Sequence, residues 1–142
     1  MPYIKGVVLG SISNGAAECA LETERGPMKV EVPLDQSFEV AEERDYADMC
    51  EMSVLNEPEV LNNILRRYKK DEIFTSIGPT LIVVNPYRTI ERLFRQEVFE
   101  EIKQKILSNK LGKDDPHVYF VAGRAYLALK ETGTKQAIVI SG

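Results

Sequence analysis

Short strands separated by turn-forming residues are predicted for the first part of the chain. Apolar and polar positions alternate in Glu18–Thr23 and Met28–Val32, and Tyr3–Leu9 is a third candidate strand. Ser13-Asn14-Gly15 and Arg25-Gly26-Pro27 separate them, and these residue types favour turns. Closely spaced strands with such turns are typical of a small antiparallel barrel. We therefore predict a barrel of this kind at the start of the chain.

An acidic segment, Glu39–Asp48, follows the predicted strands and lacks the apolar spacing of a buried element. We predict that it is a linker between a small barrel at residues 1–41 and a second domain at residues 42–142. A domain of about 40 residues is marginal without disulfides or metals. The second domain therefore carries most of the predicted core.

The first helix of the second domain is predicted from a cap and an apolar face. Asn56 followed by Glu59 has the spacing of a capping box, and Pro58 is tolerated in a first turn. Behind this cap, one helical face carries apolar residues at Val60, Leu61, Ile64, Leu65 and Tyr68. We expect this face to be buried.

Two further helices are predicted, with a hairpin before them and a strand after them. The apolar stripe of the second helix is Val98, Phe99, Ile102 and Ile106, and that of the third is Val118, Val121, Ala122, Ala125, Tyr126 and Leu129. Asp115 is the expected cap of the third helix, with Pro116 at its first position, and Gly133 ends it. Glu72–Thr75 and Thr80–Val84 read as a hairpin, and the β-branched run Ala137–Ile140 as a buried strand.

These elements predict an α+β protein. A small antiparallel barrel is followed by an incomplete α/β core of three helices, a hairpin and one sheet strand. A final strand without neighbours leaves apolar faces and backbone hydrogen-bonding groups uncovered. We therefore expect residues 45–142 to fold poorly in isolation.

Composition narrows the classes of partner. The chain has 142 residues, is 44% hydrophobic and 28% charged, and has a net charge of -4, which argues against a bulk attraction to nucleic acid or anionic membrane. Its basic cluster, Arg66, Arg67, Lys69 and Lys70, lies in the last turn of a predicted helix, where the helix dipole favours cations. No apolar run approaches the roughly 18 residues of a membrane span. A soluble, cytosolic protein is predicted.

No catalytic group of residues is evident. The only histidine, His117, stands at a helix start, where a packing or hydrogen-bonding role is the expected one. Cys19 and Cys50 have no CxxC spacing, so each is expected to be a buried, reduced thiol. No cluster of metal ligands is evident either, and no metal site is predicted.

Two places are candidates for ligand binding. Asn85-Pro86-Tyr87-Arg88 leaves the end of a predicted buried strand, where α/β folds place ligands, and it offers an amide, an aromatic ring and a guanidinium. On these residue types alone an ordinary turn is the stronger interpretation. The second place is Gly142, because a glycine after a strand can begin a phosphate-binding loop. By itself this is a weak signal, since such a loop needs further glycines and a lysine.

Several segments in order resemble the front of the myosin motor head. They are Asp48–Met52, Leu55–Tyr68, Ile73–Gly78, Leu81–Tyr87, Pro116–Tyr119, Arg124–Tyr126 and Gln136–Gly142. Their order and spacing agree with that family over about residues 45–142. Residues 1–40 are a looser match to the small SH3-like barrel that precedes many myosin heads.

The resemblance implies roles for both candidate places. In myosins the Asn-Pro-aromatic segment begins the loop that lies against the adenine of ATP, which implies a nucleotide-facing role for Asn85, Pro86, Tyr87 and Arg88. Gly142 matches the first residue of the phosphate loop. This chain departs from the family pattern at Glu91, where a proline is common, and at Leu93, where an adenine-facing tyrosine is common. Phe94 could replace that tyrosine only with a change of register.

The resemblance also implies a parent machine. We expect the N-terminal portion of an actin-based, ATP-driven motor in the cytoplasm and cytoskeleton, partnered by the remainder of the head and, through it, by actin. ATP with Mg²⁺ is the cofactor of the intact head. The lysine and threonine of the phosphate loop lie beyond Gly142, so we expect the chain alone to bind no ATP usefully and to hydrolyse none. The alternatives are a non-catalytic binding module acting through the barrel, and half of a split head assembled in trans.

Overall fold

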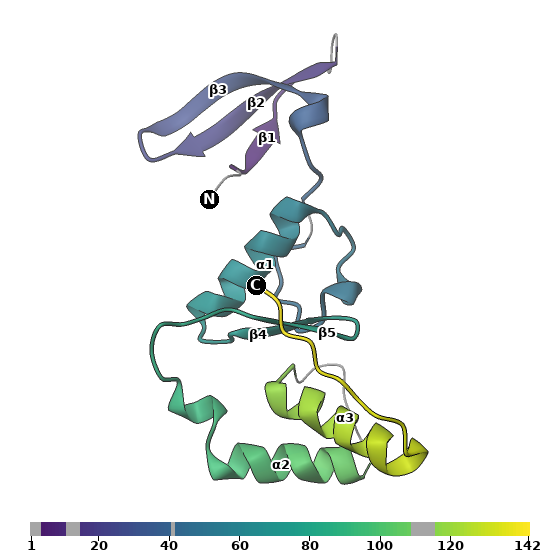
Figure 1. Ribbon diagram of the computed structural model, residues 1–142. Helices are drawn as coiled ribbons and strands as arrows, with labels where there is room; N and C mark the ends of the chain where they lie inside the picture. Colours follow the sequence, from purple (N-terminus) through teal and green to yellow (C-terminus); the bar gives the residue numbers. More distant parts are fainter. Residues whose placement is uncertain (1–3, 11–14, 41, 109–115) are drawn as a thin grey trace.

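A computed structural model describes residues 4–10, 15–40, 42–108 and 116–142 (Figure 1). In this part of the chain the strands are β1 (Gly6–Val8), β2 (Ala16–Thr23), β3 (Gly26–Pro33), β4 (Phe74–Ile77) and β5 (Thr80–Val83). The helices are α1 (Glu57–Lys69), α2 (Gln96–Leu107) and α3 (Val118–Thr132). Short 3-10 turns occur at η1 (Leu34–Gln36), η2 (Met49–Glu51) and η3 (Glu91–Leu93). Helices combined with small antiparallel sheets confirm the α+β class.

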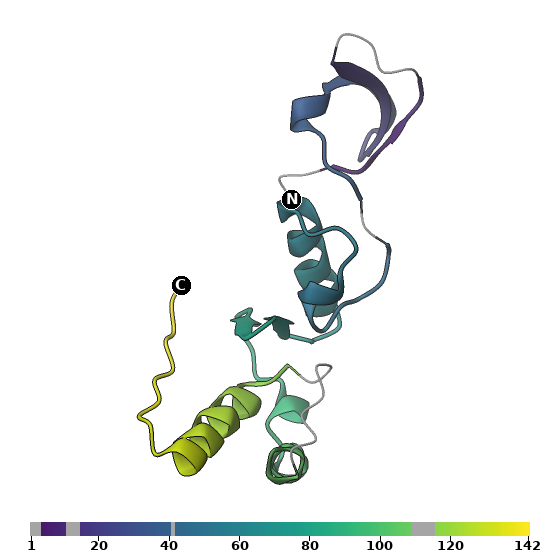
Figure 2. The same ribbon diagram turned by 90° about the vertical axis from the view of Figure 1, so that its right-hand side faces the viewer.

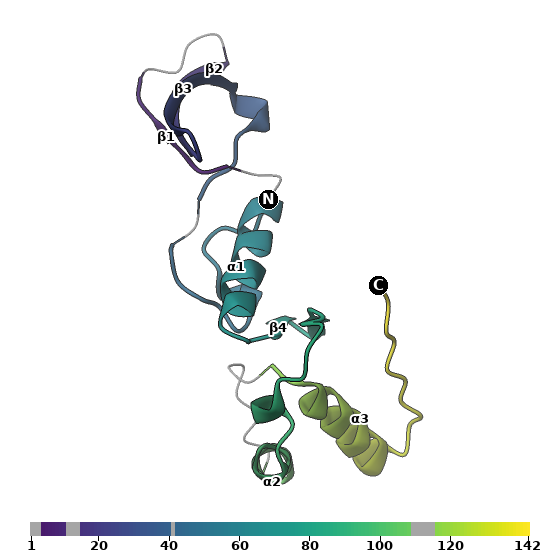
Figure 3. The same ribbon diagram turned by 90° about the vertical axis from the view of Figure 1, so that its left-hand side faces the viewer.

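Strands β1, β2 and β3 form an antiparallel sheet in that order, which we call the N-terminal sheet. Thr23 pairs with Gly26, so the β2–β3 turn consists of Glu24 and Arg25, earlier than predicted. Figures 2 and 3 show the sheet curling strongly along its strands. In the described residues it is open, with β1 and β3 at its edges, so it does not by itself form a closed barrel. Of the turn residues predicted before β2, Ser13 and Asn14 lie outside the described residues.

The second part of the predicted linker belongs to the core. The side chain of Asn63 is fully buried; its Nδ2 donates to the carbonyl of Tyr46 at 3.0 Å and its Oδ1 accepts from Tyr46 N at 2.9 Å. Tyr46 and Met49 are buried with Met52 in one apolar cluster. The linker prediction, Glu39–Asp48, is therefore wrong for Tyr46, because the Asn63 side chain satisfies its backbone and no periodic apolar pattern is needed to bury it.

Helix α1 has the predicted cap but not the predicted buried face. Asn56 Oδ1 accepts from Glu59 N at 3.0 Å, which confirms the asparagine cap. The most buried side chains of the helix are polar: Glu59, Asn63 and Arg67, spaced four residues apart. Val60, Ile64 and Tyr68 are only partly buried against the apolar clusters, and Leu61 is 38% exposed. The centre of the buried face therefore lies one residue earlier than predicted, at Glu59, Asn63 and Arg67 instead of Val60, Ile64 and Tyr68.

The β4–β5 hairpin is confirmed. Ile77 pairs with Thr80, so Gly78 and Pro79 form the two-residue turn, and Gly78 has φ +57°. A glycine with positive φ at the first turn position suits the twist of a tight hairpin. The lead-in residues Ile73 and Phe74 are buried in a cluster with Ile90.

Helices α2 and α3 pack through Ile102, Ile106 and Phe120. They approach so closely at Gly123 that a Cβ there would lie 2.2 Å from Ile106 Cδ1. Helix α3 begins at Val118 with His117 as its N-cap, so the prediction of Pro116 inside the helix is wrong. The expected cap, Asp115, lies outside the described residues. Gly133 ends α3 with φ +67°, as predicted.

The run Ala137–Ile140 is not a buried strand, and this prediction is wrong. In the described part of the chain it has no ladder partner, and Val139 and Ile140 are 87% and 93% exposed. Figure 2 shows the segment after α3 standing apart from the other elements. The reason is physical: a β-branched run becomes a strand only where a neighbouring strand accepts its backbone hydrogen bonds.

The two hydrogen bonds of Asn63 yield a test of the core. Asn63→Ala leaves the buried backbone N–H and carbonyl of Tyr46 without partners, and should lower the free energy of unfolding by about 2–4 kcal/mol. The matched control is Asn62→Ala, which removes the same side chain from the neighbouring position of α1 and should cost less than about 1 kcal/mol. Urea unfolding followed by far-UV circular dichroism measures both. Equal losses in the two variants would contradict a structural role for Asn63.

Candidate functional site

The loop after β5 holds Tyr87 in an exposed and strained position. Asn85 Oδ1 accepts from Tyr87 N at 2.8 Å, which closes a tight turn around Pro86. Tyr87 has φ +52°, a region that non-glycine residues rarely occupy, and its side chain is 91% exposed. The loop thus presents an aromatic ring to solvent from a fixed backbone.

Two arginines fasten this loop to the end of α1. Arg88 forms an ion pair with Asp71, which itself has φ +61°. Arg92 Nη2 donates to the carbonyls of Lys70 and Asp71, each at 3.0 Å. Carbonyls at the end of a helix lack helical partners and carry its negative dipole end, so a guanidinium is well matched to them. The chain that follows Tyr87 is therefore held to the end of α1 at two points, Arg88 and Arg92.

The η3 turn continues from the loop into the core. Ile90 is buried with Ile73 and Phe74, and Leu93 packs against the same cluster. The carbonyl of Leu93 lies 2.9 Å from His117 Nε2. Leu93 therefore faces inward, whereas the next ring, Phe94, is 47% exposed. The Phe94 ring is only half exposed, since its centroid lies 6.1 Å from that of Phe74 and 5.7 Å from that of His117.

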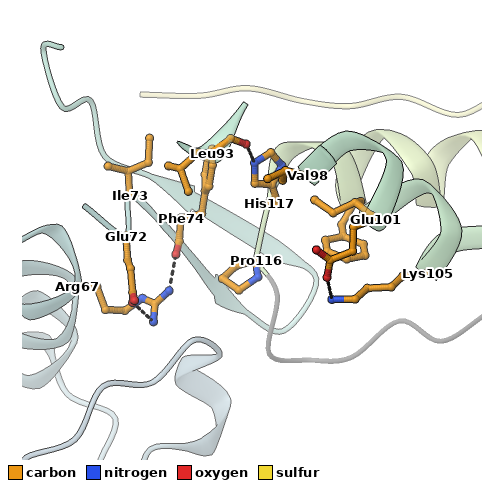
Figure 4. A pocket seen from close by; sticks show the side chains of 12 residues that line it. Arg67, Glu72, Ile73, Phe74, Leu93, Val98, Glu101, Lys105, Pro116 and His117 are labelled. Carbon is orange, nitrogen blue, oxygen red and sulfur yellow. Dashed lines mark hydrogen bonds and ion pairs between the residues drawn. The ribbon is translucent and has the colours of Figure 1, made fainter. Parts of the chain in front are cut away.

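A cavity of about 210 Å³ lies between the end of α1, the hairpin and helices α2 and α3 (Figure 4). Its walls are mostly apolar, and its charged groups are already paired. Arg67 Nη1 lies 2.9 Å from Glu72 Oε2, and Lys105 Nζ lies 2.9 Å from Glu101 Oε1. The cavity is thus an apolar space bordered by neutralised charges.

The basic cluster of α1 has specific partners within the fold, which the sequence did not indicate. Buried Arg67 donates to Thr75 Oγ1 at 3.0 Å and to the Phe74 carbonyl at 2.9 Å. Lys70 hydrogen-bonds Asp45, and that bond lowers the pKa of the Asp45 carboxyl. The helix dipole alone is therefore an incomplete account of these cations. The one sequence signal for the burial of Arg67 is its position four residues after Asn63, on the same face of the helix.

The remaining sequence-predicted residues lie apart from this loop or differ from expectation. No atom of another segment lies within 4 Å of where a Cβ on Gly142 would be, so the structure does not seat Gly142 against Asn85–Arg88. Cys19 is buried as predicted, but Cys50 is exposed. Within the described ranges, no three His, Cys, Asp or Glu side chains gather to hold a metal ion. Nor is any helix of those ranges long and apolar enough to cross a membrane.

Comparison with known proteins decides the family. Residues 46–142 match the family model of the myosin head, the motor domain. The chain belongs to the myosin head family. It is 32% identical to myosin-M heavy chain of Dictyostelium discoideum over 140 residues, 99% of this chain and 8% of the relative.

Other myosins give the same result. Human unconventional myosin-VI is 35% identical over 111 residues, 77% of this chain, and Arabidopsis thaliana myosin-2 is 32% identical over 136 residues, 94% of this chain. The matched segment spans 8% of the former and 11% of the latter. The resemblance of the ordered motifs to the myosin head is thereby confirmed, and this segment is a small part of the length of those myosins.

The strained backbone of Tyr87 in this myosin-head segment can be tested through stability. Tyr87→Gly removes the cost of a positive φ and should raise the free energy of unfolding by about 1 kcal/mol. Tyr87→Ala keeps a Cβ at the same position and should leave the stability within about 0.5 kcal/mol of the original. Urea denaturation of the three proteins provides the comparison. A destabilised glycine variant would show that the Tyr87 ring stabilises the fold and is not merely presented.

Proposed function

We propose that this chain supplies part of the nucleotide side of an actin-based, ATP-driven motor head, with Asn85, Pro86, Tyr87 and Arg88 facing the adenine of ATP. The observation that carries the proposal is the presentation of Tyr87: exposed, in a left-handed conformation, and fastened through its neighbours. Family membership supports the wider assignment. Strain of this kind persists only where surrounding contacts fix it, and such sites are often functional.

The loop geometry suits recognition of a flat heterocycle. Tyr87 offers a ring face and Arg88 a planar guanidinium, and both groups stack on aromatic bases. The Arg88–Asp71 ion pair and the two Arg92 hydrogen bonds fix the loop before any ligand arrives. A prefixed loop loses less conformational entropy on binding. Since Leu93 faces the apolar cluster, adenine contact in this chain rests on Tyr87 and Arg88, with Phe94 as the neighbouring exposed ring.

The finer assignments belong to the same proposal. Residues 1–41 act as an SH3-like small barrel, and residues 42–142 as the N-terminal part of a motor domain whose Gly142 begins the phosphate side. ATP with Mg²⁺ is the cofactor of the complete head, and its partners are the remainder of the head and actin, in the cytoplasmic cytoskeleton.

One observation favours a second candidate function, a non-catalytic binding module. The N-terminal sheet and the segments before and after it expose large apolar side chains at Ile4, Val7, Val8, Met28, Phe38 and Val40. Exposed apolar surface of this kind often marks a protein interface. In that case the barrel makes the functional contact and the myosin-like remainder is vestigial. In a further alternative, this chain is half of a split head and assembles in trans with a second polypeptide.

The 142-residue chain on its own should not respond to nucleotide. Its sequence contains no Gly-x-x-x-x-Gly-Lys segment, which supplies most of the phosphate contacts in phosphate-loop proteins. Millimolar Mg·ATP should therefore leave its thermal unfolding midpoint unchanged, because a ligand stabilises only a fold that binds it. Differential scanning calorimetry with and without Mg·ATP measures this, with Mg·GTP as the control. A midpoint that rises with Mg·ATP concentration would refute the expectation.

The adenine-facing role is tested in a complete head. In a chimaera, residues 46–142 replace the segment of human unconventional myosin-VI to which they align. Tyr87→Ala or Arg88→Ala in this chimaera should weaken Mg·ATP binding about 5- to 10-fold, as the loss of one stacking contact would. Binding of Mg·pyrophosphate, which has no base, should not change. Isothermal titration calorimetry with each of the two ligands measures these affinities.

The control variant in the chimaera is Tyr126→Ala, which removes an exposed tyrosine from α3. It should leave the affinity for both ligands unaltered. Equal weakening of Mg·ATP and Mg·pyrophosphate by Tyr87→Ala would argue against adenine contact. A folded chimaera that binds neither ligand would overturn the proposed function as a whole.

A further inference from the structure

His117 joins two elements through hydrogen bonds of opposite sense. Its Nδ1 accepts from Tyr119 N at 3.2 Å and so caps α3. Its Nε2 lies 2.9 Å from the carbonyl oxygen of Leu93, in η3. A carbonyl can only accept, so Nε2 carries the proton and Nδ1 carries none. The geometry therefore requires one species, the neutral Nε2–H imidazole.

The surroundings of His117 disfavour an imidazolium. The residue is 6% exposed, and its ring centroid lies 4.6 Å from the rings of both Phe74 and Tyr119. The charged groups that share its two cavities are Arg67, Glu72, Glu101, Lys105 and Arg124. Both carboxylates are paired with cations, Glu72 with Arg67 and Glu101 with Lys105. Burial lowers the pKa of His117 from its ordinary value of 6.5, against a smaller opposing effect of the Leu93 carbonyl.

We infer that His117 is an acid-sensitive joint, whose neutral form both caps α3 and holds η3, and whose protonation on Nδ1 removes the cap while Nε2–H keeps its bond to Leu93. A proton on Nδ1 would point at the N–H of Tyr119, so two donors would face each other and the cap of α3 would be lost. The inference does not depend on nucleotide binding.

The sign of the pH effect follows from linkage. A histidine whose folded pKa lies below its unfolded value binds its proton more readily in the unfolded chain. Its stabilising contribution is complete above the unfolded value of 6.5 and declines as the pH falls from there towards the lower folded pKa. Loss of the α3 cap is therefore expected below pH 6.5.

Nuclear magnetic resonance of the full chain tests this at one site, since His117 is the only histidine. Long-range ¹H–¹⁵N spectra should show the neutral Nε2–H tautomer at pH 7.5 and a single titration below 6.5. In the same pH step, the amide of Tyr119 should exchange with solvent about tenfold faster after correction for intrinsic rates, the scale of one lost buried hydrogen bond. The amides of Leu93 and Phe94, which bond to Ile90 and Glu91 within η3, should keep their exchange rates because Nε2–H still binds the Leu93 carbonyl.

A matched variant separates the two halves of the joint. Asparagine is a good N-cap but does not titrate here, so His117→Asn should keep the Tyr119 amide protected at every pH from 5 to 8. Its shorter side chain cannot span to Leu93, so the η3 amides should already exchange rapidly at pH 7.5. An Nδ1–H tautomer, a pKa at or above 6.5, or a Tyr119 amide that does not follow the His117 titration in the original chain would each overturn the inference.

Discussion

The buried polar face of α1 organises the second part of the molecule. Asn63 satisfies the backbone of Tyr46 on one side, and Arg67 binds the carbonyl of Phe74 and the hydroxyl of Thr75 on the other. A buried guanidinium is costly unless its hydrogen bonds and charge are matched, and Arg67 meets this condition through Glu72 as well. One helix therefore fixes both the chain that precedes it and the hairpin that follows it.

From this helix a series of polar contacts leads to the exposed loop. The hairpin starts where Arg67 binds it, and the loop after the hairpin returns to the end of α1 through Arg88 and Arg92. The η3 turn then meets His117 at the start of α3. Each contact involves a backbone carbonyl or a charged pair, so orientation and not merely burial is specified along the path. Such a path can hold a strained residue like Tyr87 in one conformation.

The predictions that rested on local sequence signals are the ones that the structure confirms. The Asn56 cap, the Gly78-Pro79 hairpin and the Gly133 helix end each depend on a few neighbouring residues and were predicted correctly. Features that need distant partners were not. Arg67 is buried because Phe74 and Thr75 lie opposite it, and Ala137–Ile140 is exposed because no strand lies beside it. The spacing of apolar residues cannot predict the burial of an amide or a guanidinium.

The close approach at Gly123 sets the spacing of α2 and α3. Because a Cβ there would lie 2.2 Å from Ile106 Cδ1, a larger residue at this position would push the two helices apart or displace Ile106. His117 lies six residues earlier, about 9 Å along the helix axis at 1.5 Å per residue. If α3 tilted by about 10° about Gly123, the imidazole would move by about 1.5 Å, enough to break its hydrogen bond to Leu93. The glycine thus keeps the start of α3 within hydrogen-bonding distance of η3.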